Sequence, residues 1–331
     1  MASIRDVAEQ CGVSTATVSR ALAGKQHIRD EVRKRVLEAA QRLDYRPNRA
    51  ARNLRSNQSS NIGLVVSDIQ NPFFTSICRA VEDAALKAGF AVFLCNTDED
   101  PEKEALYLRH LADENVAGII FAPTGRMARD SEKMSELSMP LVVIDRAIGK
   151  ELADTVVIDN AQAAFDLTEH LISHGRTRIA GIFGAQSSTG QERRKGFQTA
   201  LQKYGLTEKK KLVHSVPPRE EEGYKAVREM LSLPEPPDAI LASNGLLGLG
   251  AYRALMESGK KCPEEVSFAA FDEAAWTSLV KPSVTVLEQP TYEIGSTAAS
   301  LLLMRIEDPK RSIRQVQLKH NLLIRHSCGC A

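Results

Sequence analysis

The sequence lacks the motifs by which three common enzyme classes hold a nucleotide or activate a serine. It contains no G-x-G-x-x-G fingerprint, no G-x-x-x-x-G-K-[ST] phosphate loop and no G-x-S-x-G nucleophile elbow. Gly245, Gly248 and Gly250 have the wrong order for a dinucleotide fingerprint and fall within a predicted helix. We therefore expect no catalytic residue and no cofactor.

The sequence also lacks histidines and cysteines at the spacing that is typical of a metal site. His170 and His174 are four residues apart on a predicted helix, but Leu171 stands where a zinc protease carries its glutamate. A satisfied or solvent-facing histidine pair is expected instead. Cys328 and Cys330 could chelate a metal or oxidise, but no second pair lies near them, and a loose tail is expected. No metal site is predicted.

Long apolar runs are absent. No stretch reaches the roughly 18 apolar residues that a membrane span needs, and no basic region followed by an apolar core opens the chain. The six cysteines are scattered, so without export they are expected as reduced thiols. These features predict a cytoplasmic protein with no membrane partner.

Length and charge describe what is present. The 331 residues, 43% apolar and 26% charged, are enough for two or three domains with full cores. The net charge of +1 conceals a basic start, because the first 60 residues carry 12 Lys and Arg against 6 Asp and Glu. A basic head on an acidic body indicates that only the head meets a polyanion.

The head begins with SIRDVAEQCGVSTATVSRAL, two short helical patterns around a turn at Gly12. Ser3 and Asp6 form a capping box, and Val7, Ala8 and Cys11 share one helical face. On the second helix Val18, Ala21 and Leu22 are expected to point inward. Its outer face carries Thr15, Ala16, Ser19 and Arg20.

That outer face suits the major groove of DNA, where an arginine reads a guanine edge with two hydrogen bonds. A polar solvated face in a small helical bundle is the alternative. A third helix is predicted from Asp30 to Leu43, with Val32, Val36, Leu37, Ala40 and Leu43 as its apolar residues.

The segment Arg46–Asn57 is a basic linker of helix-forming residues with Pro47 near its start. A helix this short is marginal alone in water and needs a partner. The alternative is an ordinary basic linker in which Leu54 makes a small contact.

The start ASIRDVAEQCGVSTATVSRAL, the link YRPNRAARNLRSNQSSNIGLVV and the segment DIQNPFF together resemble bacterial repressors of the Lac repressor family, over nearly the whole chain. The resemblance implies that the linker is a hinge helix that folds on DNA. It also implies that Leu54 wedges into a minor-groove base step. The expected DNA-binding residues are Thr15, Ala16, Ser19, Arg20, Asn48, Arg49, Ala51, Leu54 and Arg55.

From Asn61 onward, short apolar strands alternate with helical patterns, which is typical of parallel sheets covered by helices on both faces. About 270 residues exceed one doubly wound sheet, so two lobes are predicted. The predicted strands are Ile62–Val66, Ala91–Cys95, Gly118–Phe121, Leu141–Ile144, Thr155–Ile158, Ile179–Phe183, Ala239–Ala242 and Val266–Phe271.

The fold class expected is a small all-α helix-turn-helix head plus an α/β body of two doubly wound parallel-sheet lobes. The resemblance implies lobes of the periplasmic-binding-protein type, joined by three crossovers, with the helix Tyr292–Ile306 returning to the first lobe. We expect the head at residues 1–45, hinge and linker at 46–60, and the effector-binding and dimerisation domain at 61–331. Lobe one would take 61–160 and 291–319, and lobe two 161–290 and 320–331.

Open α/β sheets bind ligands beyond the carboxyl ends of their strands. Carboxylates, amides, arginines and aromatic faces follow the predicted strands, and such a set suits a sugar-like ligand. The resemblance places effector contacts at matching positions. The candidate effector-binding residues are Asp68, Asn71, Phe73, Phe74, Asp145, Arg146, Arg193, Asn244, Asp272 and Gln289.

Structural roles are the alternative for these residues. Phe73 and Phe74 suit the start of a helix core, and Asn71 and Asn244 suit helix caps. The neighbouring Arg194 leaves open which arginine of the doublet enters the cleft. How many arginines do so decides whether the ligand is acidic or neutral.

These features predict a DNA-binding transcription regulator, a repressor, whose operator affinity is controlled by a small effector between the lobes. The expected partners are pseudo-palindromic double-stranded operator DNA, a second copy in a homodimer, and a sugar, sugar acid or sugar phosphate. A dimer is expected because tetrameric family members carry an added C-terminal apolar heptad segment, which does not precede Ala331.

Two other classes share the body's architecture. A periplasmic sugar-binding receptor needs an export signal and has no use for the basic head. A sugar-modifying enzyme using the same cleft needs a nucleophile, a metal or a cofactor site, and the sequence offers none.

Overall fold

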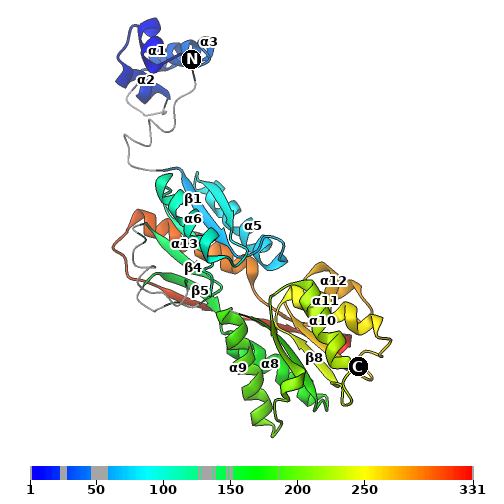
Figure 1. Ribbon diagram of the computed structural model, residues 1–331. Coiled ribbons are helices and arrows are strands. Elements are labelled where there is room, and N and C mark those ends of the chain that lie inside the picture. Colours follow the sequence, from blue (N-terminus) through cyan, green and yellow to red (C-terminus); the bar gives the residue numbers. More distant parts are fainter. Residues whose placement is uncertain are drawn as a thin grey trace. The chain divides into compact units, whose positions relative to one another are not determined.

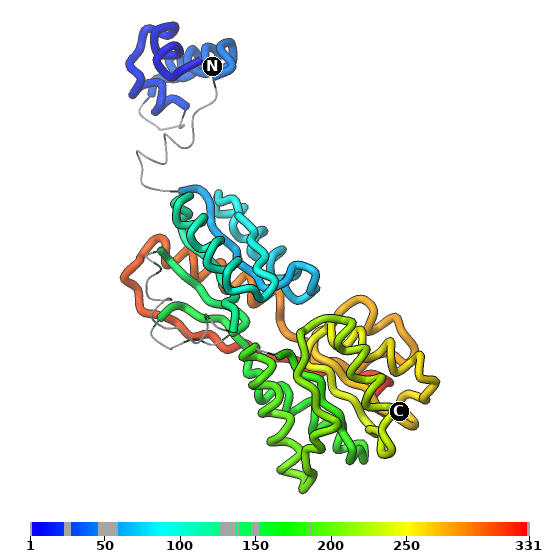
Figure 2. The backbone as a smooth tube through the Cα atoms, in the orientation of Figure 1, coloured from blue at the N-terminus to red at the C-terminus, as the bar shows by residue number. Residues whose placement is uncertain are grey.

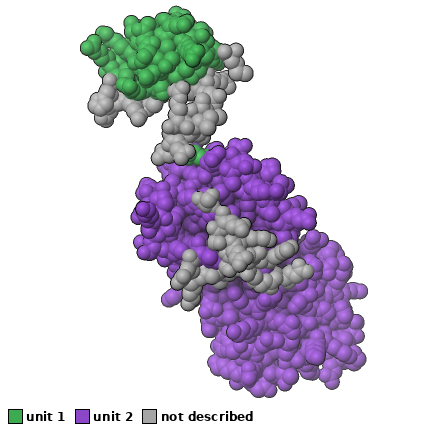
Figure 3. Space-filling view, turned by 60° about the vertical axis from the view of Figure 1, so that its left-hand side comes forward, with its two compact units in different colours: residues 1–59 green, residues 60–331 purple. Residues whose placement is uncertain are grey.

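The computed structural model describes residues 2–22, 28–45, 59–125, 127, 137, 139–146, 148, 152–185 and 187–329. The chain divides into two compact units, Met1–Ser59 and Ser60–Ala331, which Figure 3 colours separately. We call the described part of the first unit up to Tyr45 the head, and the second unit the body.

The head is a bundle of three helices, α1 (Ile4–Cys11), α2 (Thr15–Leu22) and α3 (Asp30–Arg42). The predicted capping box is confirmed, because the Ser3 amide donates to Asp6 Oδ2 at 2.7 Å and the Asp6 amide to Ser3 Oγ at 3.4 Å. Gly12 ends α1 with φ +59°, a left-handed conformation that glycine adopts without steric cost. The turn between α1 and α2 therefore follows from local sequence.

The core of the head is apolar and small. Val7, Val18 and Val36 are fully buried at the centre of the bundle. The predicted apolar face of α3 needs one correction, since Leu37 is 50% exposed. It follows the inward-facing Val36 directly, and one residue turns an α-helix by about 100°.

Lobe one is a sheet of six parallel strands with helices on both faces (Figure 1). In spatial order the strands are β11 (Gln315–Leu318), β5 (Asp154–Ile158), β4 (Leu141–Ile144), β3 (Ile119–Phe121), β1 (Asn61–Val66) and β2 (Ala91–Asn96). Helices α5 (Pro72–Lys87) and α13 (Thr291–Glu307) pack together on one face, and α6 (Pro101–Asp113) lies on the other. Alternate residues of β1 supply the two cores: Ile62 and Leu64 face α5, while Val65 faces α6.

Lobe two repeats this arrangement. In spatial order its strands are β12 (Asn321–Leu323), β10 (Thr285–Glu288), β9 (Ser267–Phe271), β8 (Ala239–Ala242), β6 (Ile179–Gly184) and β7 (Val213–Val216). Only β12 runs antiparallel to its neighbour. One face carries α8 (Asn160–Ser173) and α9 (Ser188–Lys203), and the other α10 (Glu220–Leu231) and α11 (Gly245–Glu257). Short helices α12 (Ala275–Leu279), η2 (Lys210–Leu212) and η3 (His326–Cys328) complete the lobe.

The chain passes between the two sheets three times, as the resemblance implied (Figure 2). The crossings lie between β5 and α8, between β10 and α13, and between β11 and β12. Helix α13 returns to lobe one, where Thr291 Oγ1 donates to Ser76 Oγ at 2.8 Å. All eight predicted strands form, whereas the four-residue strands β7, β10 and β11 were not predicted.

The C-terminal segment differs from the expected loose tail. Cys328 is fully buried in lobe two, where Ser267 Oγ donates to its carbonyl at 3.0 Å and Thr285 Oγ1 lies 3.1 Å from its sulfur. These hydrogen bonds fix the segment as far as η3, because buried polar groups need partners. Cys330 lies outside the described residues.

Candidate functional site

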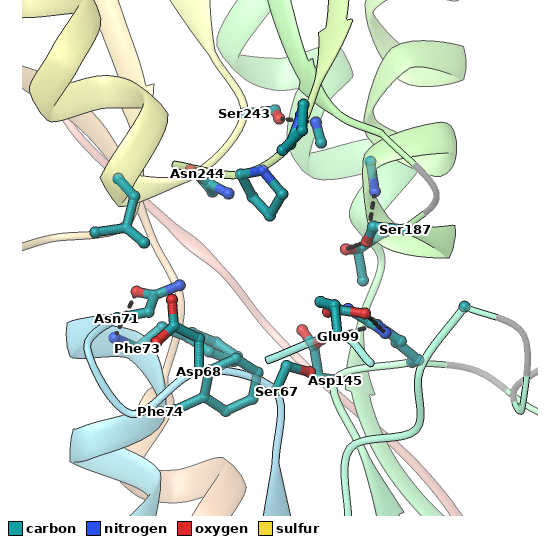
Figure 4. Close-up of a pocket in the computed structure, with 18 of the residues that line it drawn as sticks. Ser67, Asp68, Asn71, Phe73, Phe74, Glu99, Asp145, Ser187, Ser243 and Asn244 are labelled. Atoms are coloured by element: carbon teal, nitrogen blue, oxygen red, sulfur yellow. Dashed lines mark hydrogen bonds and ion pairs between the residues drawn. The ribbon is translucent and has the colours of Figure 1, made fainter. Parts of the chain in front are cut away.

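A pocket of about 500 Å³ lies between the two lobes at the carboxyl ends of the strands (Figure 4). All ten candidate effector-binding residues line it, together with other residues of both lobes. Parallel strands that share one direction bring their carboxyl ends to one edge of a sheet, so side chains distant in sequence converge there. In Figure 4, Asp68, Asn71 and Phe74 lie on one side, and Ser187, Ser243 and Asn244 face them across the cavity.

The aromatic wall belongs to lobe one. Asn71 caps α5 by accepting the Phe73 amide at 3.1 Å, and Pro72 occupies the first helical turn, where its missing N–H costs nothing. The rings of Phe73 and Phe74 pack edge to face with centroids 4.9 Å apart. Both rings are buried in the lobe-one core, as the structural interpretation predicts, and both also line the pocket.

The charged wall of lobe one centres on Arg146, whose side chain is only 4% exposed. Its Nη1 donates to Glu99 Oε2 at 2.9 Å and its Nη2 donates to Glu99 Oε1, while Nε lies 3.4 Å from Asp145 Oδ2. Burial lowers the pKa of Arg146, but the hydrogen bonds and charges of Glu99 and Asp145 outweigh burial and raise it. The guanidinium is therefore already paired with carboxylates of the protein.

Asp145 itself is deeply buried beside this pair. Burial raises the pKa of its carboxyl to about 6, against the attraction of Arg146 and Arg193. Its backbone adopts φ +67°, an uncommon conformation outside glycine. The carboxylate therefore titrates close to neutral pH.

The wall of lobe two holds Arg193 in a different way. Its Nε donates to Asn160 Oδ1 at 2.8 Å and its Nη1 to the Ser243 carbonyl at 2.6 Å. The guanidinium also lies over the Phe271 ring, 4.2 Å from the centroid. Burial lowers the pKa of Arg193 and outweighs the opposing attraction of the Asp272, Asp145 and Glu192 carboxylates.

Asp272 and Gln289 complete this wall. Asp272 Oδ2 accepts the Gly245 amide at 2.9 Å, and its Oδ1 accepts Gln289 Nε2 at 2.7 Å. Asn244 caps α11 by accepting the Leu247 amide at 2.8 Å. Gln289 follows β10 at a crossing between the lobes, so this hydrogen bond ties the pocket to a crossover.

The two arginines of the doublet, Arg193 and Arg194, point to different places. Arg193 lines the pocket, whereas Arg194 Nη2 donates to Glu208 Oε1 at 2.6 Å on another face of α9. The pocket also includes residues that the sequence analysis missed, namely Ser67, Asp98, Glu99, Thr124, Ser187, Thr189, Arg219 and Ser243. Asp98 and Glu99 follow strand β2, so the strand-end rule contained the signal for them.

The candidate DNA-binding face of the head is exposed. Thr15, Ala16, Ser19 and Arg20 are all accessible on α2. Ser14 precedes this helix and its Oγ accepts the Thr17 amide at 3.2 Å. The hinge residues Asn48, Arg49, Ala51, Leu54 and Arg55 lie outside the described residues.

Within the described ranges, no group of three His, Cys, Asp or Glu side chains could hold a metal ion. His170 and His174 stack at 4.6 Å, and His174 Nδ1 lies 2.8 Å from the His170 carbonyl. No helix in the described part of the chain combines the length and the apolar character of a membrane span.

Comparison with known proteins gives matches along most of the chain. Residues 3–48 match the family model "Bacterial regulatory proteins, lacI family". Residues 59–326 match "Periplasmic binding proteins and sugar binding domain of LacI family". The chain is 34% identical over 328 residues to the ribose operon repressor of Halalkalibacterium halodurans, covering 99% of this chain and 97% of that protein.

Solved structures agree with this match. The transcriptional regulator CelR in complex with cellobiose has a TM-score of 0.73 at 29% identity, covering 99% of this chain and all of that one. The Lac repressor dimer bound to operator and the anti-inducer ONPF has a TM-score of 0.86 at 24% identity, covering 99% of each chain. The second likeness shows the shared fold.

Proposed function

Because the chain belongs to the LacI family of bacterial regulatory proteins, it is a DNA-binding transcription regulator and not an enzyme, and we propose that a small sugar-like effector in the interlobe pocket controls its operator affinity. The regulator acts as a repressor in the cytoplasm. The observation that carries the proposal is the pocket itself, whose polar and aromatic residues come from strand ends of both lobes.

A ligand that touches both walls favours one arrangement of the lobes over others. Such a ligand shifts the population between lobe arrangements by its difference in affinity for them. Gln289 lies at one crossing and bonds Asp272, and Asn160 follows another crossing and bonds Arg193. These contacts support a coupling between ligand binding and the segments that join the lobes.

The effector-binding set comprises the ten predicted residues, with Phe73 and Phe74 as the stacking face and Arg193, Asn244 and Asp272 as hydrogen-bonding groups. A pyranose or furanose ring presents an apolar face and several hydroxyls, which matches aromatic rings beside carboxylates and amides. The names of two similar proteins, a ribose operon repressor and a cellobiose complex, support a sugar.

The DNA-binding set comprises Thr15, Ala16, Ser19 and Arg20 in the head and Asn48, Arg49, Ala51, Leu54 and Arg55 in the hinge. The head ends near residue 45, the hinge occupies 46–60, and the two lobes divide the remainder as the sequence predicts. Exposure of the small outer face of α2 supports its placement in a major groove.

A homodimer fits both the DNA and the protein surface. Edge strand β2 exposes Phe93 and Leu94, at 39% and 50%, and an open apolar edge invites pairing with another chain. Two heads related by a two-fold axis match a pseudo-palindromic operator. A solved relative is a dimer on its operator.

Leu54 supplies a test of the hinge. We expect Leu54→Ala to reduce DNA bending and specific affinity while leaving affinity for random duplexes nearly unchanged, because the lost wedge acts only where a base step is unstacked. Bending and affinity are measured on operators with different central steps. If bending and central-step preference survive in Leu54→Ala, the segment is only a basic tether.

The effector proposal is tested with full-length protein and an operator that the protein selects from random duplexes. Fluorescence anisotropy gives operator affinity with neutral sugars, sugar acids and sugar phosphates. We expect at least one compound to change that affinity by about 5- to 150-fold. A panel that leaves operator affinity unchanged, with no compound bound in calorimetry, contradicts the proposal.

A further inference from the structure

Glu99 enters the pocket from the turn between β2 and α6, and this turn is held by its own contacts. Asp98 and Glu99 both have positive φ, +53° and +59°, which is rare for consecutive residues with side chains. Asp98 accepts Lys103 Nζ at 2.5 Å and Asn96 Nδ2 at 2.7 Å, and Asp100 caps α6 by accepting the Glu102 amide at 2.8 Å. The turn therefore aims Glu99 at Arg146 without help from a ligand.

The pairing of Glu99 with Arg146 uses both carboxylate oxygens and both terminal nitrogens of the guanidinium. This forked geometry is the one in which arginine binds the carboxylate or phosphate of a ligand. Arg146 Nη1 also donates to the Pro123 carbonyl, and Nε faces Asp145. Both hydrogens of Nη1 and one hydrogen of Nη2 are therefore used by Glu99 and Pro123, so an anionic ligand can bind Arg146 in the forked geometry only if Glu99 withdraws.

We propose that Glu99 is a built-in anion that occupies Arg146 and makes the pocket selective for neutral sugars over sugar acids and sugar phosphates. This inference rests on the proposed sugar-binding function and narrows its ligand class. Glu99 would then determine specificity, although it is not among the candidate effector-binding residues predicted from the sequence.

The charge balance of the pocket supports the same conclusion. Among the described lining residues, five carboxylates face three guanidiniums. Arg193 gives its bonded donors to neutral acceptors, and the exposed Arg219 of lobe two lies near Asp98. A carboxylate or phosphate entering this pocket meets a surplus of negative charge, whereas a hydroxyl both donates and accepts.

Displacing Glu99 is also unfavourable in itself. An anionic ligand that takes Arg146 leaves the Glu99 carboxylate, which is 31% exposed, without its partner and beside buried Asp145. Separating a partly buried ion pair costs free energy, because the remaining charge is neither paired nor fully hydrated. The built-in pair therefore competes against any anionic ligand that binds Arg146.

The test measures calorimetric affinities of full-length protein for ribose and cellobiose and for the phosphate and carboxylate derivatives of each. We expect the wild type to bind a neutral sugar about 100-fold or more tightly than its anionic derivatives. In Glu99→Gln, which keeps the side-chain shape but frees the charge of Arg146, we expect this ratio to fall by about tenfold or more.

Glu102→Gln is the matched control, because it makes the same change in charge at an exposed glutamate of the first turn of α6 that is not among the residues lining the pocket. We expect its ratio to change less than about threefold. Equal or tighter wild-type binding of the anionic derivatives overturns the inference, as does an unchanged ratio in Glu99→Gln or an equal shift in Glu102→Gln. The wild-type ratio tests selectivity even if a variant unfolds.

Failure of the proposed function gives a different pattern. If neither neutral nor anionic sugars bind wild type or variants, both the sugar-binding function and this inference are wrong. If sugars bind but charge discrimination is absent or independent of Glu99, the inference alone is wrong.

Discussion

Lobe one and lobe two order their six strands identically but hold their pocket residues by different means. In lobe one, Arg146 is paired with the carboxylates of Glu99 and Asp145. In lobe two, Arg193 is fixed by an amide, a backbone carbonyl and an aromatic ring. The same strand order therefore supports two kinds of pocket wall. In lobe one the arginine is paired with carboxylates, and in lobe two it is held by neutral groups.

We infer from this difference that the two walls have different roles in ligand binding. If Glu99 occupies Arg146 as proposed, the charged wall of lobe one sets which ligand charge is accepted, because Arg146 is already paired with carboxylates. The wall of lobe two is bonded to residues at two crossings, Asn160 and Gln289, so movement of a ligand-bound group there reaches the connections between the lobes. Selectivity then belongs mainly to lobe one, and the response to ligand mainly to lobe two.

The largest expected effect is on the free energy of unfolding, and it compares one aspartate of each lobe that is not among the pocket residues. Asp154 in lobe one is fully buried and accepts from Arg305 and Arg311, whereas Asp238 in lobe two is partly exposed and accepts the Thr177 and Arg178 amides. Asp154→Ala should lower the free energy of unfolding by about 3–5 kcal/mol, because two buried guanidiniums lose their anion.

The matched variant Asp238→Ala should cost only about 1–2 kcal/mol, the value of solvent-accessible hydrogen bonds to backbone amides. Urea unfolding of both variants, followed by circular dichroism, measures the two changes. Equal losses of unfolding free energy in the two variants would contradict the expectation that Asp154 contributes more to stability than Asp238.

The next effect concerns the wall of lobe two. Arg193→Ala and Asp272→Ala should each abolish the effector's influence on operator binding, a loss of about 2 kcal/mol of coupling. Operator affinity without effector should stay nearly intact, because both residues lie in the body and not in the head. Anisotropy titrations with and without effector measure both quantities. A variant that keeps the normal response removes its residue from the site.

The loss of a single DNA contact in the head should weaken DNA binding without changing how the two lobes bind the effector. Arg20→Ala should weaken specific DNA binding by about 1–3 kcal/mol and relax the preference at one base pair per half-site. Affinity for the effector in the absence of DNA should not change. An equal loss on specific and random duplexes would identify Arg20 as a phosphate contact.

The smallest effect is the pH dependence of the charged wall. Since the pKa of Asp145 is raised to about 6, its carboxylate is ionised above that pH and protonated below it. A protonated carboxyl accepts ligand hydroxyls less well, so effector affinity should fall several-fold, about 2- to 5-fold, as pH drops from 7 to 5. Asp145→Asn should show weak binding without this pH dependence. Calorimetry that finds the same pH profile in Asp145→Asn assigns the titration to another group.

Much of this arrangement could be predicted from sequence because parallel strands bring their ends together. Asp68, Asp145 and Asp272 each follow an apolar strand, and all three line one pocket. The contacts that hold Arg193 could not be predicted, since Asn160 and Ser243 meet it only after the sheet of lobe two has formed.

Local backbone and long-range contacts explain the remaining misses. The positive φ of Glu99 has no signature in its residue type, yet it directs the side chain toward Arg146. Cys328 looked like part of a loose tail because its partners, Ser267 and Thr285, lie about 40 to 60 residues away in the chain. The four residues of β7, VHSV, include a histidine and a serine, whereas the equally short strands β4 and β8 are wholly apolar and could be predicted.

The central claim is that the pocket and the DNA-binding head are coupled through the arrangement of the lobes. The most direct measurement is the affinity of full-length protein for its effector with and without saturating operator. Thermodynamic reciprocity requires operator to change effector affinity by the same factor by which effector changes operator affinity. We predict two equal factors within the range of about 5- to 150-fold, in wild type and in Arg20→Ala at saturating DNA. Effector affinity that stays the same with and without operator would contradict the account.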